Sequence, residues 1–180
     1  MNSEYTTAYI ALGSNLGDRA GNLLLAVRGL MEASFHVHKL SAIYETEPYE
    51  IESDTNFLNM VAEIHVASVS ASQMMARLLR IEYLLGRKFK NLKKPRTVDL
   101  DILFFGDVRM ETEFLVLPHP RLHQRKFVLC PLAEIAPDLV HPVLHAKISD
   151  ILAGCEDICE AKRWNPNARL PQQLIREELD

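Results

Sequence analysis

The sequence predicts an α+β fold in which an antiparallel sheet carries two helices on one face. Segments with β-type alternation and segments with helical spacing of apolar residues follow one another as strand, helix, strand, strand, helix, strand. This βαββαβ order is typical of a ferredoxin-like sandwich, and shorter helical segments follow it. With 180 residues, 48% of them hydrophobic, the chain is predicted to form one domain over residues 1–180. We expect a core over about residues 5–152 and a C-terminal extension over 153–180.

The first strand is predicted over residues 5–12, and a turn-rich segment from Gly13 to Asp18 ends it. An Asp or Asn cap then begins a helix. Its apolar face is predicted to hold Leu24, Val27, Leu30 and Met31. The Gly-Ser-Asn loop could bind phosphate, but it lacks the established glycine-rich phosphate motifs, so a structural turn is favoured.

Further strands are expected over residues 35–44 and 57–66, with a long loop over 46–56 between them. On the second of these strands the core face is predicted to hold Leu58, Met60, Ala62, Ile64 and Val66. Phe57 and Asn59 share its other face with Val61, Glu63 and His65. An aromatic ring and an amide so placed could bind a flat heterocycle, or could simply be exposed. His36, His38 and His65 lack a Cys or carboxylate at ligand spacing and are predicted to lie on the surface.

The second helix is predicted to begin at Ser70 or Ser72 and to end near Gly86. Its buried face holds Met74, Leu78, Ile81 and Leu85, and Glu82 lies off that face. After the last strand of the core, a short strand over 108–111 is predicted to complete a hairpin. An irregular proline-rich segment over 117–121 and short helices over 121–128, 131–135 and 148–152 follow.

The segment from Asp99 to Gly106 is the most informative strand of the sequence. Alternation places Asp99 and Asp101 on one face and Leu100, Ile102 and Phe104 on the other. Two neighbouring carboxylates on a strand are costly unless a cation neutralises them, and oxygen ligands without Cys or His suit Mg²⁺ bound together with substrate phosphates. Arg96 precedes the strand as a phosphate partner. The alternative for the carboxylate pair alone is an edge strand with two solvated Asp side chains.

Charge and composition exclude several classes of function. The formal net charge of −4 argues against a general nucleic-acid-binding protein, and no apolar run is long enough to span a membrane. Three cysteines without a Cys-x-x-Cys pair, and no visible secretory signal, predict a cytoplasmic protein with reduced thiols. A basic cluster suits a polyphosphate ligand or a solvated loop. Its residues are Arg87, Lys88, Lys90, Lys93, Lys94 and Arg96.

Several separated segments resemble one known family in the same order along the chain. They are 9–17 (YIALGSNLG), 44–48 (YETEP), 57–59 (FLN), 80–82 with 86–87 (RIE, GR), 95–102 (PRTVDLDI) and 118–121 (PHPR), followed by Arg125 and Phe127. The chain resembles the 6-hydroxymethyl-7,8-dihydropterin pyrophosphokinases of folate biosynthesis over roughly residues 5–142.

The resemblance implies transfer of the β,γ-diphosphate of ATP to the hydroxymethyl group of the pterin, with release of AMP. ATP is then a co-substrate, and Asp99 and Asp101 are implied ligands of two Mg²⁺ ions. The implied catalytic residues are Arg87, Arg96, Asp99 and Asp101. The implied pterin-binding residues are Thr46, Tyr49, Phe57, Asn59 and Phe127. The implied ATP-binding residues are Glu82, Arg87, Arg96, Ile102, His119 and Arg125.

The basic loop departs from the family pattern. Phe89, Lys93 and Lys94 stand where an Arg, an aromatic and a small residue are common, and the loop is about one residue shorter. A non-catalytic pterin- or nucleotide-binding protein on the same fold is therefore the alternative to an enzyme. The complete set of arginines, carboxylates and His119 favours the enzyme. The oligomeric state, monomer or dimer, stays open.

Overall fold

A computed structural model of the chain describes residues 5–48, 55–87 and 95–166. The main sheet contains β1 (Thr6–Ser14), β2 (His36–Leu40), β3 (Tyr44–Thr46), β4 (Phe57–Val66), β5 (Asp99–Phe105) and β8 (Lys162–Arg163). The helices are α1 (Arg19–Glu32), α2 (Ala71–Leu84), the 3₁₀-helix η1 (Leu122–Gln124), α3 (Lys126–Ile135) and α4 (Ile148–Ala153). A separate hairpin consists of β6 (Met110–Glu111) and β7 (Val116–Leu117).

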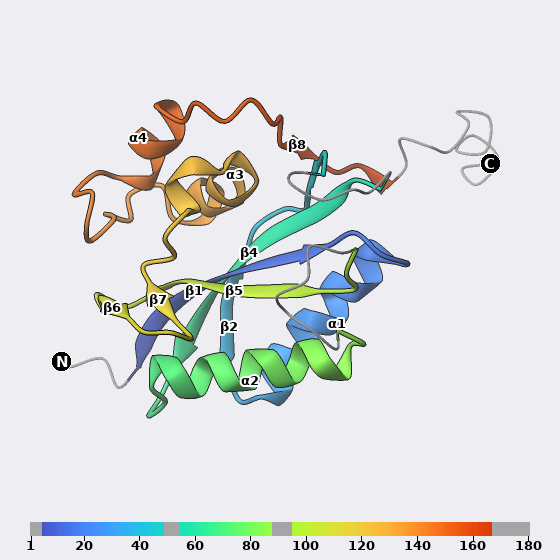
Figure 1. The fold of residues 1–180 in the computed structure, drawn as a ribbon, viewed down its shortest axis with the longest axis horizontal. Helices are drawn as coiled ribbons and strands as arrows, with labels where there is room; N and C mark the ends of the chain where they lie inside the picture. The colour runs from blue at the N-terminus through green and yellow to red at the C-terminus, as the bar shows by residue number, and fades with distance from the viewer. Residues whose placement is uncertain (1–4, 49–54, 88–94, 167–180) are drawn as a thin grey trace, which may run out of the picture.

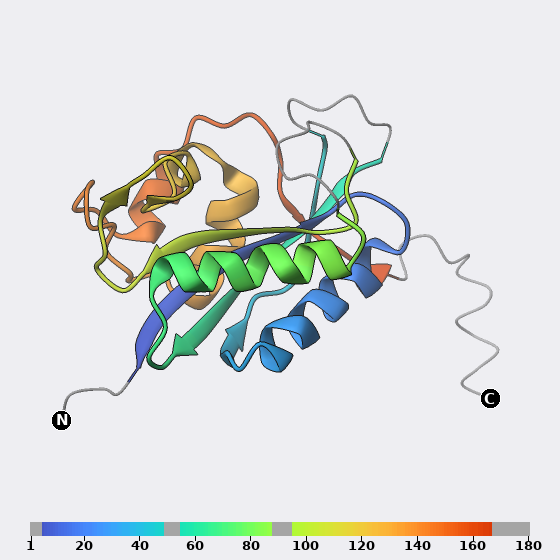
Figure 2. The ribbon, with the colours of Figure 1, turned by 60° about the horizontal axis from the view of Figure 1, so that its bottom comes forward.

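All strand pairings described in this sheet are antiparallel, and the strand order is β5-β1-β4-β3-β8, with β2 also paired to β4. Helices α1 and α2 cover one face, and α3 and α4 lie on the opposite side (Figure 1, Figure 2). The predicted α+β sandwich of the ferredoxin-like type is therefore confirmed. The face opposite α1 and α2 is covered as well, which makes three layers.

The main core lies between the sheet and helices α1 and α2. The alternation predicted for β4 is confirmed, because Leu58, Met60, Ala62, Ile64 and Val66 are all buried in this core. On α2 the predicted face is confirmed by buried Met74, Leu78 and Ile81 and by partly buried Leu85. Ser70, rather than Ser72, begins α2 with a reciprocal capping box to Gln73.

The face predicted for α1 is confirmed for Leu30, which is buried, and for Val27, which packs against the main core, but it is wrong for Leu24 and Met31. Leu23, Ala26 and Leu30 are buried, whereas Leu24 and Met31 are 63% and 62% exposed. Asp18 caps the helix by accepting a hydrogen bond from the Gly21 N–H, as the sequence predicts. Both candidate faces carry apolar side chains, so their spacing cannot decide between them. The contact of α1 with the sheet decides it.

A second apolar cluster fills the space between the sheet and α3. Tyr9, Val61 and Leu103 from the sheet contact Leu129 and Leu132 from α3 in this cluster. The two short helices predicted around Pro131 are in fact the 3₁₀-helix η1 followed by one continuous helix, α3, which contains that proline. Pro131 lies one turn into α3, where the missing N–H removes a single hydrogen bond.

The strand predicted over residues 35–44 is divided into β2 and β3. Ser41 lies between them and replaces a regular ladder bond, since its Oγ accepts a hydrogen bond from the Val61 N–H at 2.9 Å. At the far edge, β8 of the C-terminal extension pairs with β3, and the sequence did not predict this pairing.

A β-bulge in β5 interrupts the alternation of faces that the sequence predicts for this strand. Tyr9 pairs with Phe104 and Ile10 with Ile102, so Leu103 is the extra residue. Leu103 and Phe104 consequently both enter the second cluster, while Phe105 turns into the main core. Phe104 was predicted on the face of Leu100 and Ile102 and lies on the other.

The strand predicted over 108–111 is present as the shorter strand β6, and it pairs with β7 rather than with β5. A segment predicted to be irregular therefore supplies a strand at residues 116–117. Among the described residues, no helix is long and apolar enough to cross a membrane.

Candidate active site

A row of residues across three strands forms the floor of the candidate site. Gly13 of β1 pairs with Asp99 of β5 on one side and with Asn59 of β4 on the other. Alternation brings Asp101 onto the same face as Asp99, as predicted, and all four residues line one cavity. A Cβ on Gly13 would lie 3.2 Å from Asn59 Oδ1 and 3.9 Å from Asp99 Cβ. The glycine therefore keeps open the space between the carboxylate and the amide.

Two arginines contact the first carboxylate. Arg87 donates to Asp99 Oδ1, and Arg96 Nη1 donates to Asp99 Oδ2 at 2.8 Å. The Arg87 side chain is 5% exposed, and those of Arg96 and Asp99 are 17% and 20% exposed. Guanidinium groups next to a carboxylate in a partly buried cleft form a ready site for a ligand that carries negative charge and a cation.

Glu82 of α2 contacts both Arg87 and the main chain of β5 and so fixes their relative positions. Glu82 Oε1 accepts hydrogen bonds from Arg87 Nη1 at 2.9 Å and from the Leu100 N–H at 2.7 Å. Although Glu82 was predicted to lie off the buried face of α2, it is only 2% exposed. Its buried charge is neutralised by the arginine, which explains why burial is tolerated there.

Two aromatic rings stand at the cavity, each with an arginine over its face. The Arg96 guanidinium lies 5.5 Å from the centroid of the Phe57 ring, and that of Arg125 lies 5.4 Å from the centroid of the Phe127 ring. Phe57 comes from β4 and Phe127 from the first turn of α3, and both line the cavity. The structure thus brings together the two aromatic residues that are 70 positions apart in the sequence.

Polar groups with a defined orientation complete this side of the cavity. Asn59 Nδ2 donates to Thr46 Oγ1 at 2.9 Å, and both residues are almost fully buried. Thr46 pairs with Phe57 in the β3–β4 ladder, so the amide, hydroxyl and ring come from neighbouring positions. Tyr49, also predicted here, lies outside the described residues, as do the basic-loop positions 88–94 with Lys88, Phe89, Lys90, Lys93 and Lys94.

His119 does not line this cavity but a different one, and a hydrogen bond from its N–H to the Leu103 carbonyl oxygen at 3.0 Å holds it there. Burial lowers the pKa of its imidazole, while Asp101 opposes that shift and Arg125 adds to it. The charges of Asp101 and Arg125 therefore act on His119. Ile102, another predicted ATP-side residue, has its side chain in the main core and does not line the cavity.

The donor set fits a hard divalent cation. Asp99 and Asp101 offer only carboxylate oxygens to the cavity, and no Cys or His is among the described residues that line it. Arg96 Nε is buried without a hydrogen-bond partner among the described residues, which leaves one donor for a ligand oxygen.

The sequence analysis missed two residues of the site. Gly13 and Asn15 were assigned to a structural turn, yet Gly13 opens the cavity, and Asn15 Oδ1 accepts a hydrogen bond from the Arg96 N–H at 2.8 Å. The Asn15 N–H in turn donates to the Arg96 carbonyl oxygen at 3.1 Å. The Gly-Ser-Asn sequence indicated a possible site, but Arg96, the residue that Asn15 contacts, is far away in the chain.

Comparison with known proteins gives one consistent family. The model of the 7,8-dihydro-6-hydroxymethylpterin-pyrophosphokinase (HPPK) family matches residues 9–137. A 2-amino-4-hydroxy-6-hydroxymethyldihydropteridine pyrophosphokinase of Bacillus subtilis is 49% identical over 129 residues, which are 71% of this chain and 77% of that protein. A protein of the same name from Aquifex aeolicus is 35% identical over 144 residues, which are 80% of this chain and 89% of that protein.

Solved structures agree on the fold. A Plasmodium falciparum HPPK-DHPS crystal structure matches with a TM-score of 0.68 at 16% identity, over 85% of this chain and 46% of that chain. The present chain thus spans less than half of that longer protein, and the likeness concerns the fold alone.

Proposed function

The chain belongs to the 7,8-dihydro-6-hydroxymethylpterin-pyrophosphokinase family, and from this premise we propose how its own residues carry out the reaction. The reaction is ATP-dependent transfer of a diphosphate group to the hydroxymethyl group of a dihydropterin in folate biosynthesis. The observation that carries the proposal is the row Asp99–Gly13–Asn59, which places the carboxylate and the amide in one cavity. We propose that residues 1–180 act as one domain, with a core over about residues 5–152.

The pterin occupies the end of the cavity between Phe57 and Phe127. The two rings stack on the flat heterocycle, and the Arg96 and Arg125 guanidiniums, which lie over these rings in the structure, turn toward phosphate when the ligands bind. Asn59 and Thr46 hydrogen-bond to its polar edge, since an amide presents both donors and an acceptor. Tyr49 adds to this contact. Burial of the amide and the hydroxyl gives selectivity, because a ligand without matching groups leaves them unpaired.

ATP binds on the Asp99 side of the cavity. Arg87, Arg96, Arg125 and His119 contact its phosphates, and Glu82 and the Ile102 main chain lie toward the nucleoside. Asp99 and Asp101 would hold two Mg²⁺ ions, and these ions would lower the pKa of the attacking hydroxyl and neutralise charge on the phosphate oxygens. In the structure both oxygens of Asp99 contact arginines, so binding of ATP exchanges these arginine–carboxylate contacts for arginine–phosphate contacts.

The test is formation of AMP from ATP with Mg²⁺, with and without 6-hydroxymethyl-7,8-dihydropterin, for the parent protein and for Asp99→Asn and Asp101→Asn. We expect pterin-dependent AMP without ADP, and a loss of at least about a hundredfold in kcat in each variant with the fold retained, because charge neutralisation dominates this chemistry.

Asp107→Asn is the matched control, since this acidic residue is exposed in the turn that follows β5. It should leave the rate unchanged. Pterin binding without any AMP would instead identify the non-catalytic binding protein. Equal activity in Asp101→Asn and the parent would remove that carboxylate from the proposed metal site.

A further inference from the structure

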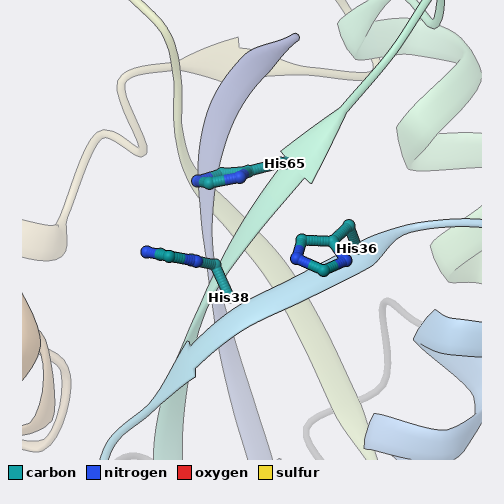
Figure 3. Close-up of side chains that lie close together, drawn as sticks. All are labelled: His36, His38 and His65. Atoms are coloured by element: carbon teal, nitrogen blue, oxygen red, sulfur yellow. The ribbon is translucent and has the colours of Figure 1, made fainter.

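A cluster of three histidines lies on the sheet, away from the cavity of the active site. His36 and His38 of β2 and His65 of β4 each offer one ring nitrogen, and these nitrogens all lie within 4.8 Å of one another. Figure 3 shows the three imidazoles together on one side of the paired strands β2 and β4. All three histidines were predicted to lie on the surface, but no contact between them was predicted. His65 belongs to a different strand from His36 and His38, so spacing along the sequence does not relate it to them.

Strand alternation and register produce this arrangement, because His36 and His38 are two residues apart on β2. His36 pairs directly with His65, and the register shifts between Val37 and Lys39, so His38 is the extra residue. A bulge re-aims the inserted side chain and lets two successive residues point to one face. His38 shares the face of His36 by alternation, and the bulge adds Lys39, which pairs with Glu63, to the same face.

Glu63 adds a carboxylate that is oriented toward the imidazoles. Its Oε2 is held by the Tyr9 hydroxyl at 3.4 Å and by Lys39 Nζ at 3.2 Å. Its other oxygen, Oε1, lies 3.5 Å from His65 Nε2 and 3.9 Å from His38 Nε2. The side chain is only 8% exposed, so one carboxylate oxygen is fixed in place and the other faces two of the three rings.

We propose that His36, His38 and His65, with Glu63, form a binding site for a divalent transition metal of the Zn²⁺ class. Imidazole nitrogens and one carboxylate oxygen are the ligand set that Zn²⁺ takes, whereas Mg²⁺ prefers oxygen ligands alone. Bonds of about 2.0–2.1 Å place tetrahedral ligands about 3.3 Å apart, so the rings move closer together by small side-chain rotations. His36 and His38 are exposed and free to make that change.

The site is separate from the Mg²⁺ site of the diphosphate transfer. His65 and Asn59 both belong to β4, and at about 3.3 Å per residue they lie about 20 Å apart along the strand. A metal ion at the histidines would tie β2, whose residues are mostly exposed, to the central strand β4. The ion would thus act on the stability of the sheet and not on the chemistry.

The experiment is equilibrium dialysis of the untagged protein against Zn²⁺ with Mg²⁺ in excess, so that the carboxylates at the active site are already occupied. We expect one bound Zn²⁺ per chain at about 10 µM free metal, with affinity at least about tenfold weaker in His38→Gln and in His65→Gln. Zn²⁺ should also raise the thermal unfolding temperature of the parent protein and not that of His38→Gln.

His145→Asn is the matched control, because this histidine is exposed, lies outside the cluster and has a positive φ that Asn tolerates. It should bind Zn²⁺ like the parent protein. Circular dichroism of each variant shows that the fold is intact. Absence of Zn²⁺ binding to the parent, or equal binding by His38→Gln and the parent, would overturn the proposal.

Discussion

Gly13 shows how a single residue sets the shape of the active site. It occupies the central position of the row Asp99–Gly13–Asn59, where any side chain would point into the cavity. Its φ is not in the left-handed region, so the requirement for glycine there is space and not backbone conformation.

We expect Gly13→Ala to lower kcat/KM for the pterin by at least about tenfold, which corresponds to about 1.4 kcal/mol. The added Cβ lies 3.2 Å from Asn59 Oδ1 and displaces the amide from the pterin edge. Steady-state kinetics with varied pterin and with varied ATP measure the effect. Gly154→Ala is the control, because a Cβ there meets only an ordinary contact at 3.6 Å. A normal KM for pterin in Gly13→Ala would show that Asn59 does not contact the substrate.

His141 gives a prediction for the dependence of stability on pH. Its Nδ1 accepts hydrogen bonds from the Val143 and Leu144 N–H groups, both at 3.2 Å, and a protonated Nδ1 cannot accept them. Burial lowers the pKa of this imidazole, and nearby His123 and Arg109 lower it further. The neutral ring therefore stabilises the fold above the unfolded-state pKa of about 6.5, and this contribution is lost as the pH falls through the lowered pKa.

Urea unfolding at about pH 7.5 and about pH 5 measures this contribution. Asn at position 141 keeps an acceptor for the same N–H groups but does not titrate. We expect the acid-induced loss in the free energy of unfolding to be about 1 kcal/mol smaller in His141→Asn than in the parent protein. An identical pH dependence in the two proteins would contradict this assignment.

At the scale of elements, α2 and β5 are joined through one buried carboxylate. Glu82 Oε1 accepts hydrogen bonds from both the Leu100 N–H and Arg87, so truncation removes one buried acceptor from a backbone donor and from a guanidinium. We expect Glu82→Ala to lower the free energy of unfolding by about 3 kcal/mol, and Glu82→Gln, which keeps an acceptor, to lower it by less. Urea unfolding measures both values.

Glu32→Gln provides the comparison for an exposed ion pair. Glu32 binds Arg28 at 2.7 Å, but the two side chains are 63% and 73% exposed. Its loss should cost less than about 0.5 kcal/mol. If Glu82→Ala cost no more than Glu32→Gln, the contact between α2 and β5 would carry no stability.

Two β-bulges explain why the sequence predicts only part of the side-chain orientation along β2 and β5. In β5 the extra Leu103 moves Phe104 to the second cluster, and in β2 the extra His38 brings Lys39 onto the face of the three histidines. Before each bulge the alternation holds, so Asp99 and Asp101 share a face as predicted. A bulge is visible only in the pairing with the neighbouring strand, and the sequence of one strand does not contain that information.

At the scale of the whole molecule, the sheet is buried on both faces. The main core lies under α1 and α2, and a second cluster lies under α3, which also presents Phe127 to the active site. The two clusters share the strands β1, β4 and β5, so we expect them to unfold together.

Leu129→Ala tests this expectation. Leu129 is fully buried in the second cluster, and its truncation should cost about 2–5 kcal/mol. The single tryptophan, Trp164, packs against the other cluster, the main core, and its fluorescence reports unfolding there. In a cooperative fold the fluorescence and far-ultraviolet circular dichroism midpoints in urea shift equally. A shift of the circular dichroism midpoint alone would mean that α3 unfolds independently. Leu24→Ala is the control, because Leu24 is exposed and its truncation should shift the two midpoints only slightly.

The sequence by itself determined the order of strands and helices in the βαββαβ core, the two faces of β4, the candidate caps of each long helix and the carboxylate pair on β5. These features depend on contacts within a few residues, where periodicity and capping chemistry are strong. Only the tertiary structure decided which face of α1 is buried, that α3 covers the second face of the sheet, that Gly13 and Asn15 belong to the site, and that three histidines meet. Each of these depends on a partner distant in the chain, so local pattern leaves several arrangements open until the sheet is assembled.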